Sequence, residues 1–89
     1  MDKENQIDDP VLRSIKSMFE HGEVKRMYEI HKLSPTKITK ALGLNHGRYI
    51  DKLSNPEKFS VKDIMSLSTL LRINPEIVFR IIIGELNKR

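Results

Sequence analysis

The chain has 89 residues, 38% hydrophobic and 31% charged, which suits one small globular domain rather than two. It contains no cysteine, which excludes disulfides and thiolate metal sites, and its apolar runs are too short to cross a bilayer. The net charge is +4, yet the opening MDKENQIDDP is polar and acidic, so we expect no signal peptide and no membrane segment. A cytoplasmic protein is the default expectation.

The positive charge is concentrated beyond the N-terminal quarter of the chain. Residues 1–22 hold three basic and five acidic side chains, whereas residues 23–89 hold thirteen basic and seven acidic ones. The densest stretch, residues 32–62, has seven basic side chains against two acidic ones. Charge of this kind is typical of a surface that meets a phosphate backbone, although charge alone favours an ordinary solvated surface.

In chain order, residues 1–8 are expected to form a disordered tail. A helix is then predicted over residues 9–22, with Asp9 as its N-cap and Pro10 at its first position. Gly22 is expected to end or bend this helix. Its apolar residues recur with helical spacing and form one stripe: Val11, Leu12, Ile15, Met18 and Phe19. Residues 23–32 are predicted to form the next helix, with Val24 and Met27 facing inward.

The centre of the chain, residues 33–53, reads LSPTKITKALGLNHGRYIDKL and predicts a short helix, a tight turn and a second short helix. Ser34 is expected to cap the first helix through its side-chain oxygen, with Pro35 at the first position. Gly43 stands where a chain leaving a helix often needs a positive φ. Asn45 is expected to cap the second helix. The inward-facing set is Ile38, Leu42, Leu44, Tyr49, Ile50 and Leu53.

This stretch resembles the helix-turn-helix of the lambda-repressor-like (XRE/Cro-type) family of DNA-binding proteins. The resemblance is carried by Leu33, Ser34, Ile38, Leu42, Gly43, Leu44 and Asn45, and it extends from about Glu23 to about Phe79. It implies an all-α, five- to six-helix domain over residues 23–89, with the 9–22 helix as an addition. The implied function is sequence-specific binding of double-stranded DNA by a small, repressor-like transcriptional regulator, as in bacteria or phage, with the helix at about 46–54 in the major groove.

Three positions depart from the family pattern. Pro35 stands where the family often has a glutamine that helps to clamp a phosphate. Thr39 stands where it usually has alanine or glycine, because the two helices touch there. Lys52 stands where it usually has an apolar residue, and here Leu53 is the apolar one. The last departure leaves the register of the turn open, and with it the side chains that face outward.

By resemblance, the residues that read base edges are His46, Gly47 and Arg48. Arg48 can place its two-pronged guanidinium on guanine O6 and N7 or pair with a phosphate, and Gly47 lets the backbone approach the groove. Asp51 is interpreted as a helix-surface charge, with acceptance from cytosine N4 as the alternative. The residues expected at phosphates are Thr36, Lys37, Asn45, Lys52, Asn55 and Lys58.

The remaining elements are one turn and two helices. A turn is predicted around Pro56, with Phe59 buried. Ser60 with Asp63 resembles a capping box that opens the next helix, and its core face is expected to be Ile64, Leu67, Leu70 and Leu71. The sequence Asn74-Pro75-Glu76 begins a last helix, about 75–86, although its three consecutive isoleucines also suit a strand.

The last helix is too apolar for a helix with one buried stripe. One interpretation is a homodimer through this helix, the N-terminal helix or both, with the interface at Phe79, Ile82, Ile83 and Leu86. The alternative is that the 9–22 helix covers this face within one chain.

Catalysis is not expected. His21, His31 and His46 have no metal-ligand spacing, and there is no cysteine nucleophile and no phosphate-cradling glycine loop. No cofactor, metal or small-molecule substrate is therefore predicted. Two alternatives to DNA binding stay open. One is a protein-interaction module, such as an antitoxin or an adaptor, and the other is a structural oligomerisation unit.

Overall fold

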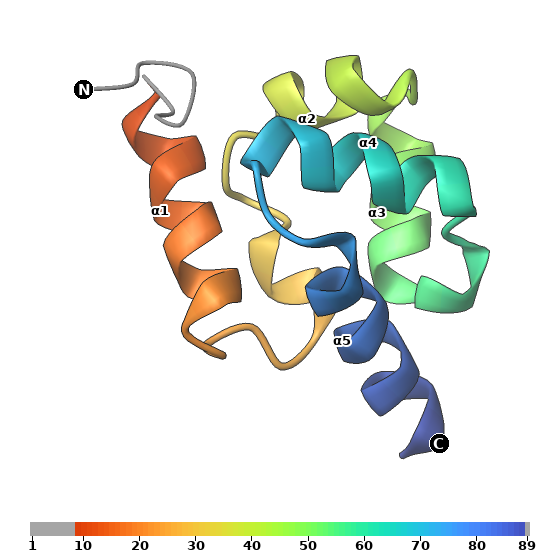
Figure 1. Ribbon diagram of the computed structural model, residues 1–89. Coiled ribbons are helices and arrows are strands. Elements are labelled where there is room, and N and C mark those ends of the chain that lie inside the picture. The colour runs from red at the N-terminus through yellow and green to blue at the C-terminus, as the bar shows by residue number, and fades with distance from the viewer. Residues whose placement is uncertain (1–8, 89) are drawn as a thin grey trace.

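The computed structural model describes residues 9–88, and within that range the protein is all-α (Figure 1). The predicted tail at residues 1–8 lies outside the described part. Five α-helices form a small bundle together with two short 3-10 helices. In chain order the elements are α1 Pro10–Glu20, η2 Met27–Ile30, α2 Pro35–Leu42, α3 His46–Ser54, η3 Pro56–Lys58, α4 Val61–Leu71 and α5 Pro75–Asn87.

Helix α1 is part of the core rather than an appendage. The Asp9 carboxylate accepts from the backbone N–H groups of Val11 and Leu12 at 2.8 and 3.1 Å, which confirms the predicted cap. Its buried face, Leu12, Ile15 and Phe19, packs on α4 and α5. The helix lies along one side of the bundle, where it covers apolar surface within one chain (Figure 1).

The helix predicted over residues 23–32 is wrong. The chain there is irregular, and only one 3-10 turn forms, at Met27–Ile30. Val24, Met27 and Ile30 are nevertheless buried, at a spacing of three residues that matches the 3-10 period and not the α period. The Met27 N–H donates to the Glu85 carboxylate on α5, so a distant side chain satisfies a group that an α-helix would have bonded internally.

The turn between α2 and α3 follows from Gly43. Its φ is +69°, and the Leu44 N–H reaches back to the Thr39 carbonyl at 3.0 Å, so the end of α2 closes in a Schellman motif. Pro35 begins α2 as predicted, but the prediction that the Ser34 side chain caps this helix is wrong. Ser34 occupies the cap position with φ +47° and makes no side-chain cap bond, because its backbone is itself in the left-handed region.

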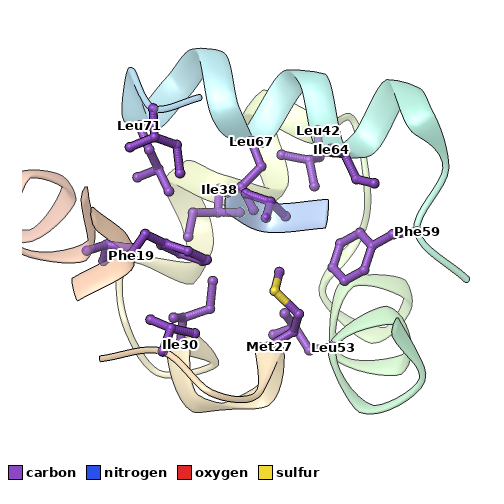
Figure 2. Close-up of a cluster of buried hydrophobic side chains, with 14 of the residues drawn as sticks. Phe19, Met27, Ile30, Ile38, Leu42, Leu53, Phe59, Ile64, Leu67 and Leu71 are labelled. Atoms are coloured by element: carbon purple, nitrogen blue, oxygen red, sulfur yellow. The ribbon is translucent and has the colours of Figure 1, made fainter. Parts of the chain in front are cut away.

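One continuous core joins all five helices (Figure 2). Helix α2 packs on α4, α4 packs on α5, and α3 packs between η2 and η3. Phe59 is buried as predicted, and the capping box of Ser60 and Asp63 is present in full at the start of α4. The last segment is helical, because Asn74 caps α5 through the Glu76 N–H at 2.9 Å. The strand alternative for this segment is therefore excluded.

Candidate nucleic-acid interface

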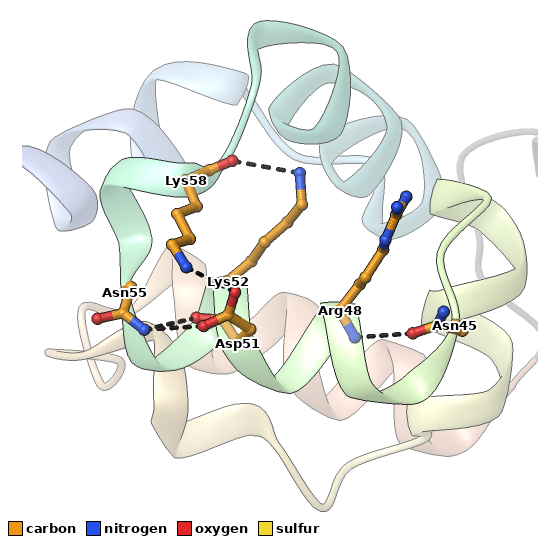
Figure 3. Close-up of polar contacts among 6 residues, drawn as sticks. All are labelled: Asn45, Arg48, Asp51, Lys52, Asn55 and Lys58. Atoms are coloured by element: carbon orange, nitrogen blue, oxygen red, sulfur yellow. Dashed lines mark hydrogen bonds and ion pairs between the residues drawn. The ribbon is translucent and has the colours of Figure 1, made fainter.

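The first turn of α3 is capped and faces solvent. The Asn45 side-chain oxygen accepts from the Arg48 N–H at 2.8 Å, which confirms Asn45 as the cap and sets the start of the helix (Figure 3). His46, Gly47 and Arg48 are all exposed. The three residues predicted to read bases therefore lie together at an accessible helix N-terminus. In helix-turn-helix proteins this end of the recognition helix reaches base edges in the groove.

Burial decides the register that the sequence left open. Tyr49 and Leu53 are fully buried, and one helical turn separates them. Successive residues are about 100° apart around a helix, so the opposite, outward face carries Gly47 and Asp51, with Arg48 at its edge. The inward stripe predicted for α3 is confirmed at Tyr49 and Leu53, and Ile50 is half-buried against the core.

Arg48 has a free guanidinium. Within residues 9–88 no ion pair or side-chain hydrogen bond engages it, and Figure 3 shows the side chain extending from α3 with only its backbone N–H bonded. A planar group with several donors and no internal partner keeps its full capacity for an external acceptor.

Lys52, which was predicted to lie at a phosphate, is engaged within the chain. Its ammonium pairs with the Asp63 carboxylate and donates to the Lys58 carbonyl at 3.2 Å, and its side chain is 19% exposed. Burial disfavours the charged form of Asp63, but the Lys52 ammonium and the Ser60 N–H outweigh it and lower the pKa of that carboxyl. Lys52 therefore ties α3 to the start of α4.

Asn55 and Lys58 are also engaged within the chain. Lys58 pairs with Asp51 at 2.8 Å, and the Asn55 amide donates to the Asp51 carbonyl and carboxylate at 3.2 and 3.0 Å (Figure 3). The hydrogen bond from Lys58 is the main reason that the pKa of Asp51 is lowered. Both partners of the Lys58–Asp51 pair are about half exposed, at 52% and 49%. The pair neutralises the acidic residue on the outer face of α3, and Lys58 is not a free phosphate ligand in this conformation.

Thr36 and Lys37 are exposed in the first turn of α2, as a phosphate contact requires. Lys37 forms an ion pair with Asp9, the cap of α1. Sequence reasoning missed this partner because 27 intervening residues separate the two, and only the tertiary structure brings the start of α1 close to the start of α2. Two further exposed lysines, Lys40 on α2 and Lys62 on α4, form no ion pair within residues 9–88.

The predicted dimer residues divide into two groups. Phe79 and Ile83 are 53% and 39% exposed, and Leu86 is half-buried. Ile82, which was also predicted at the dimer interface, is only 4% exposed and belongs to the core of its own chain. Helix α1 packs on α5 but leaves Phe79 and Ile83 in solvent, so the covering helix hides only part of this apolar face.

No three histidine or acidic side chains within residues 9–88 gather closely enough to hold a metal ion. An open hollow of about 710 Å³ lies between η2 and the C-terminal ends of α3 and α5, with Lys25, Arg26 and Glu85 in its wall. It lies at the end of α3 opposite to His46 and Arg48.

None of the helices between residues 9 and 88 combines the length and the apolar character that a bilayer-spanning segment needs. Comparison of the chain with models of protein families, with curated proteins and with solved structures found no match.

Proposed function

We propose that this protein binds double-stranded DNA in a sequence-specific manner and acts as a small, repressor-like transcriptional regulator, with α2 and α3 as a helix-turn-helix. The observation that carries the proposal is the capped first turn of α3, which presents an unpaired Arg48 to solvent. Helix α3 enters the major groove, and Arg48 meets the O6 and N7 acceptors of a guanine.

Gly47 supports this proposal because the fold does not require a glycine at this position. A Cβ built on Gly47 meets only the Asn45 side-chain oxygen at 3.6 Å, an ordinary contact. Alanine therefore fits the free protein, and by helix propensity it stabilises α3 by up to about 1 kcal/mol. Folding gives no reason for a glycine there, whereas close approach of the helix backbone to a groove does.

The surrounding charge favours a phosphate backbone as partner. Residues 32–62 carry a net charge of +5, from seven basic and two acidic side chains. Thr36 and Lys37 on α2 flank the reading helix on one side, and Lys58 flanks it on the other after exchange of Asp51 for a phosphate. Each phosphate neutralised releases about one counterion, so binding weakens steeply as salt rises.

The test is selection of bound duplexes from a random pool, followed by affinity measurements across a salt series. Arg48→Ala is expected to cost about 1–3 kcal/mol on the selected sequence and to relax the preference at one base pair. Gly47→Ala is expected to raise the melting temperature of the free protein and to weaken DNA binding. Arg80→Ala on α5 removes an equal charge from an exposed residue outside the proposed interface and serves as the control. Unchanged binding by Arg48→Ala and Gly47→Ala would refute the proposed interface.

A second function, a protein-interaction module of the antitoxin or adaptor kind, is favoured by one observation. Phe79 and Ile83 expose apolar surface on α5, away from the first turn of α3. A module of this kind is not retained on DNA or heparin at low salt, whereas a DNA-binding protein is. The same surface also suits a homodimer that reads two half-sites about one helical turn apart.

A further inference from the structure

Asp51 lies on the outer face of α3, one helical turn beyond Gly47. One of its carboxylate oxygens accepts from the Asn55 amide at 3.0 Å, and the other accepts from the Lys58 ammonium at 2.8 Å (Figure 3). The Asn55 amide also donates to the Asp51 carbonyl at 3.2 Å, so it bridges the backbone and the side chain of Asp51. These contacts hold the carboxylate in one orientation on the face of α3 that is proposed to meet a groove.

The Asp51 side chain can accept hydrogen bonds but cannot donate them. The hydrogen bond from Lys58 lowers the pKa of Asp51, so the carboxyl group is ionised at neutral pH. An ionised carboxylate has about four lone-pair sites, and the bonds from Asn55 and Lys58 use two of them. The side chain is 49% exposed, which leaves room for a donor from outside the chain.

Cytosine is the base whose edge in the major groove fits such an acceptor. Cytosine presents the N4 amino donor, guanine presents the acceptors O6 and N7, and thymine presents the acceptor O4. Adenine has a donor at N6, but the acceptor N7 lies beside it. A carboxylate placed against O6, N7 or O4 is a desolvated charge without a partner, which is costly. The short side chain of Asp51 reaches a base edge only if the helix comes close, and Gly47 on the same face allows that approach.

We propose that Asp51 is a specificity-determining residue that accepts from the N4 amino group of a cytosine, while Lys58 exchanges Asp51 for a backbone phosphate and Asn55 keeps the carboxylate in place. This role of Asp51 rests on the proposed function. The exchange leaves Lys58 paired with an anion and opens one carboxylate oxygen to the base. A base without a donor at this position leaves that oxygen unpaired inside the interface, and this cost is the source of the discrimination.

The spacing along α3 also places the cytosine relative to the guanine of Arg48. Asp51 follows Arg48 by three residues, which is about 4.5 Å along a helix axis. Successive base pairs are about 3.4 Å apart. We therefore expect the cytosine in the base pair that Arg48 reads or in a neighbouring one.

The experiment selects duplexes from a random pool with the parent and with Asp51→Asn, and then measures affinities at the position where the two pools differ. The parent is expected to prefer cytosine over thymine there by about tenfold. Asparagine has nearly the same size, but its amide can also donate to thymine O4, so we expect this preference to fall below about threefold. A preference for cytosine that is equal in both proteins would overturn the role of Asp51.

The matched control is Glu76→Gln on α5. Glu76 is also an exposed carboxylate that pairs with a cation, Arg80 at 3.5 Å, and it lies outside the proposed interface. Both substitutions remove one negative charge, so a general gain in affinity for DNA is common to them. The ratio of affinities for cytosine and thymine is expected to change only in Asp51→Asn. Urea unfolding checks that both variants are folded.

Lys58→Met tests the exchange. It is expected to weaken binding to the cytosine and thymine duplexes by the same factor and to reduce the slope of log affinity against log salt by about one, because one phosphate contact is lost. A loss of the cytosine preference as large as that in Asp51→Asn would overturn the exchange, since Lys58 would then be required to orient Asp51 in the complex.

Failure of this proposal and failure of the proposed function give different results. A parent protein that enriches no sequence removes the proposed function and the role of Asp51 with it. A parent that enriches a sequence which Asp51→Asn enriches equally well keeps the proposed function and overturns the role of Asp51 alone. In an Arg48→Ala background the cytosine preference is expected to persist, because it belongs to Asp51. Its disappearance there would show that it derives from the guanine contact instead.

Discussion

The ion pair between Lys52 and Asp63 holds α3 against the start of α4, and replacing Lys52 tests how much of the domain depends on it. The exposed fractions of the two side chains are 19% and 8%, so the pair lies mostly out of water. The substitution Lys52→Met keeps a long unbranched side chain but removes the charge. Asp63 is left buried with the Ser60 N–H as its remaining donor, at 2.9 Å.

The expected loss is about 2–3 kcal/mol in the free energy of unfolding. Removing one partner of a buried pair typically costs about 3–5 kcal/mol, because the other charge stays buried and unpaired. Asp63 lies in the first turn of α4, where the helix dipole and the Ser60 N–H stabilise a negative charge by about 1–2 kcal/mol. In a domain of this size the remainder corresponds to a fall of about 10–20 °C in melting temperature.

The assay is urea unfolding of the parent and of Lys52→Met at pH 7 and near pH 3. The pKa of Asp63 is lowered in the folded parent, so the stability it contributes is present above its ordinary pKa. That contribution is lost as pH falls through the lowered value. In Lys52→Met the lysine ammonium no longer opposes the effect of burial on Asp63, so the pKa of Asp63 rises and protonation relieves the cost. We therefore expect the penalty of Lys52→Met to shrink toward pH 3.

The exposed pair of Lys58 and Asp51 supplies the control. Lys58→Met removes the same kind of charge from a pair that is about half exposed, and we expect no measurable change in stability. Adding Asp63→Asn to Lys52→Met is expected to recover at least half of the loss, since asparagine still accepts from Ser60. A penalty for Lys52→Met within about 0.5 kcal/mol of zero, or one that is equal at both pH values, would refute the reasoning.

Three further predictions follow from the core and the surface. Tyr49→Phe is expected to stabilise the protein by about 1 kcal/mol in urea unfolding, because the buried Tyr49 hydroxyl has no hydrogen-bond partner among residues 9–88; a loss of stability would point to an unseen partner. Arg72→Gly is expected to raise the free energy of unfolding and Gly43→Ala to lower it, by about 1 kcal/mol each in urea unfolding, because both residues end a helix at positive φ; changes of equal sign would contradict this. Replacing both Phe79 and Ile83 by serine is expected to abolish any concentration dependence of the mass in sedimentation; dependence that survives would place self-association elsewhere.

Much of the fold follows from local signals in the sequence. The caps at Asp9, Asn45, Ser60 and Asn74 all form side-chain bonds to the first turns of their helices. Gly43 ends α2 at positive φ as predicted. These signals act within three or four residues of the chain, so their outcome does not depend on what packs around them.

Less of the candidate site could be predicted from the sequence. His46, Gly47 and Arg48 were placed from the caps, and they are exposed as a reading surface requires. The sequence does not show which neighbouring lysines form ion pairs within the chain, since their partners lie far along the chain or on other elements. Asp9 engages Lys37, and Asp63 engages Lys52.

The sequence by itself determined where the five α-helices begin and where α2 ends, because the signals at helix ends are short-range. Tertiary structure alone decided that residues 23–32 form only a 3-10 turn, that α1 joins the core, and which lysines stay free. Those outcomes rest on contacts between segments that the chain separates by tens of residues, such as Met27 with Glu85, and no local pattern encodes them.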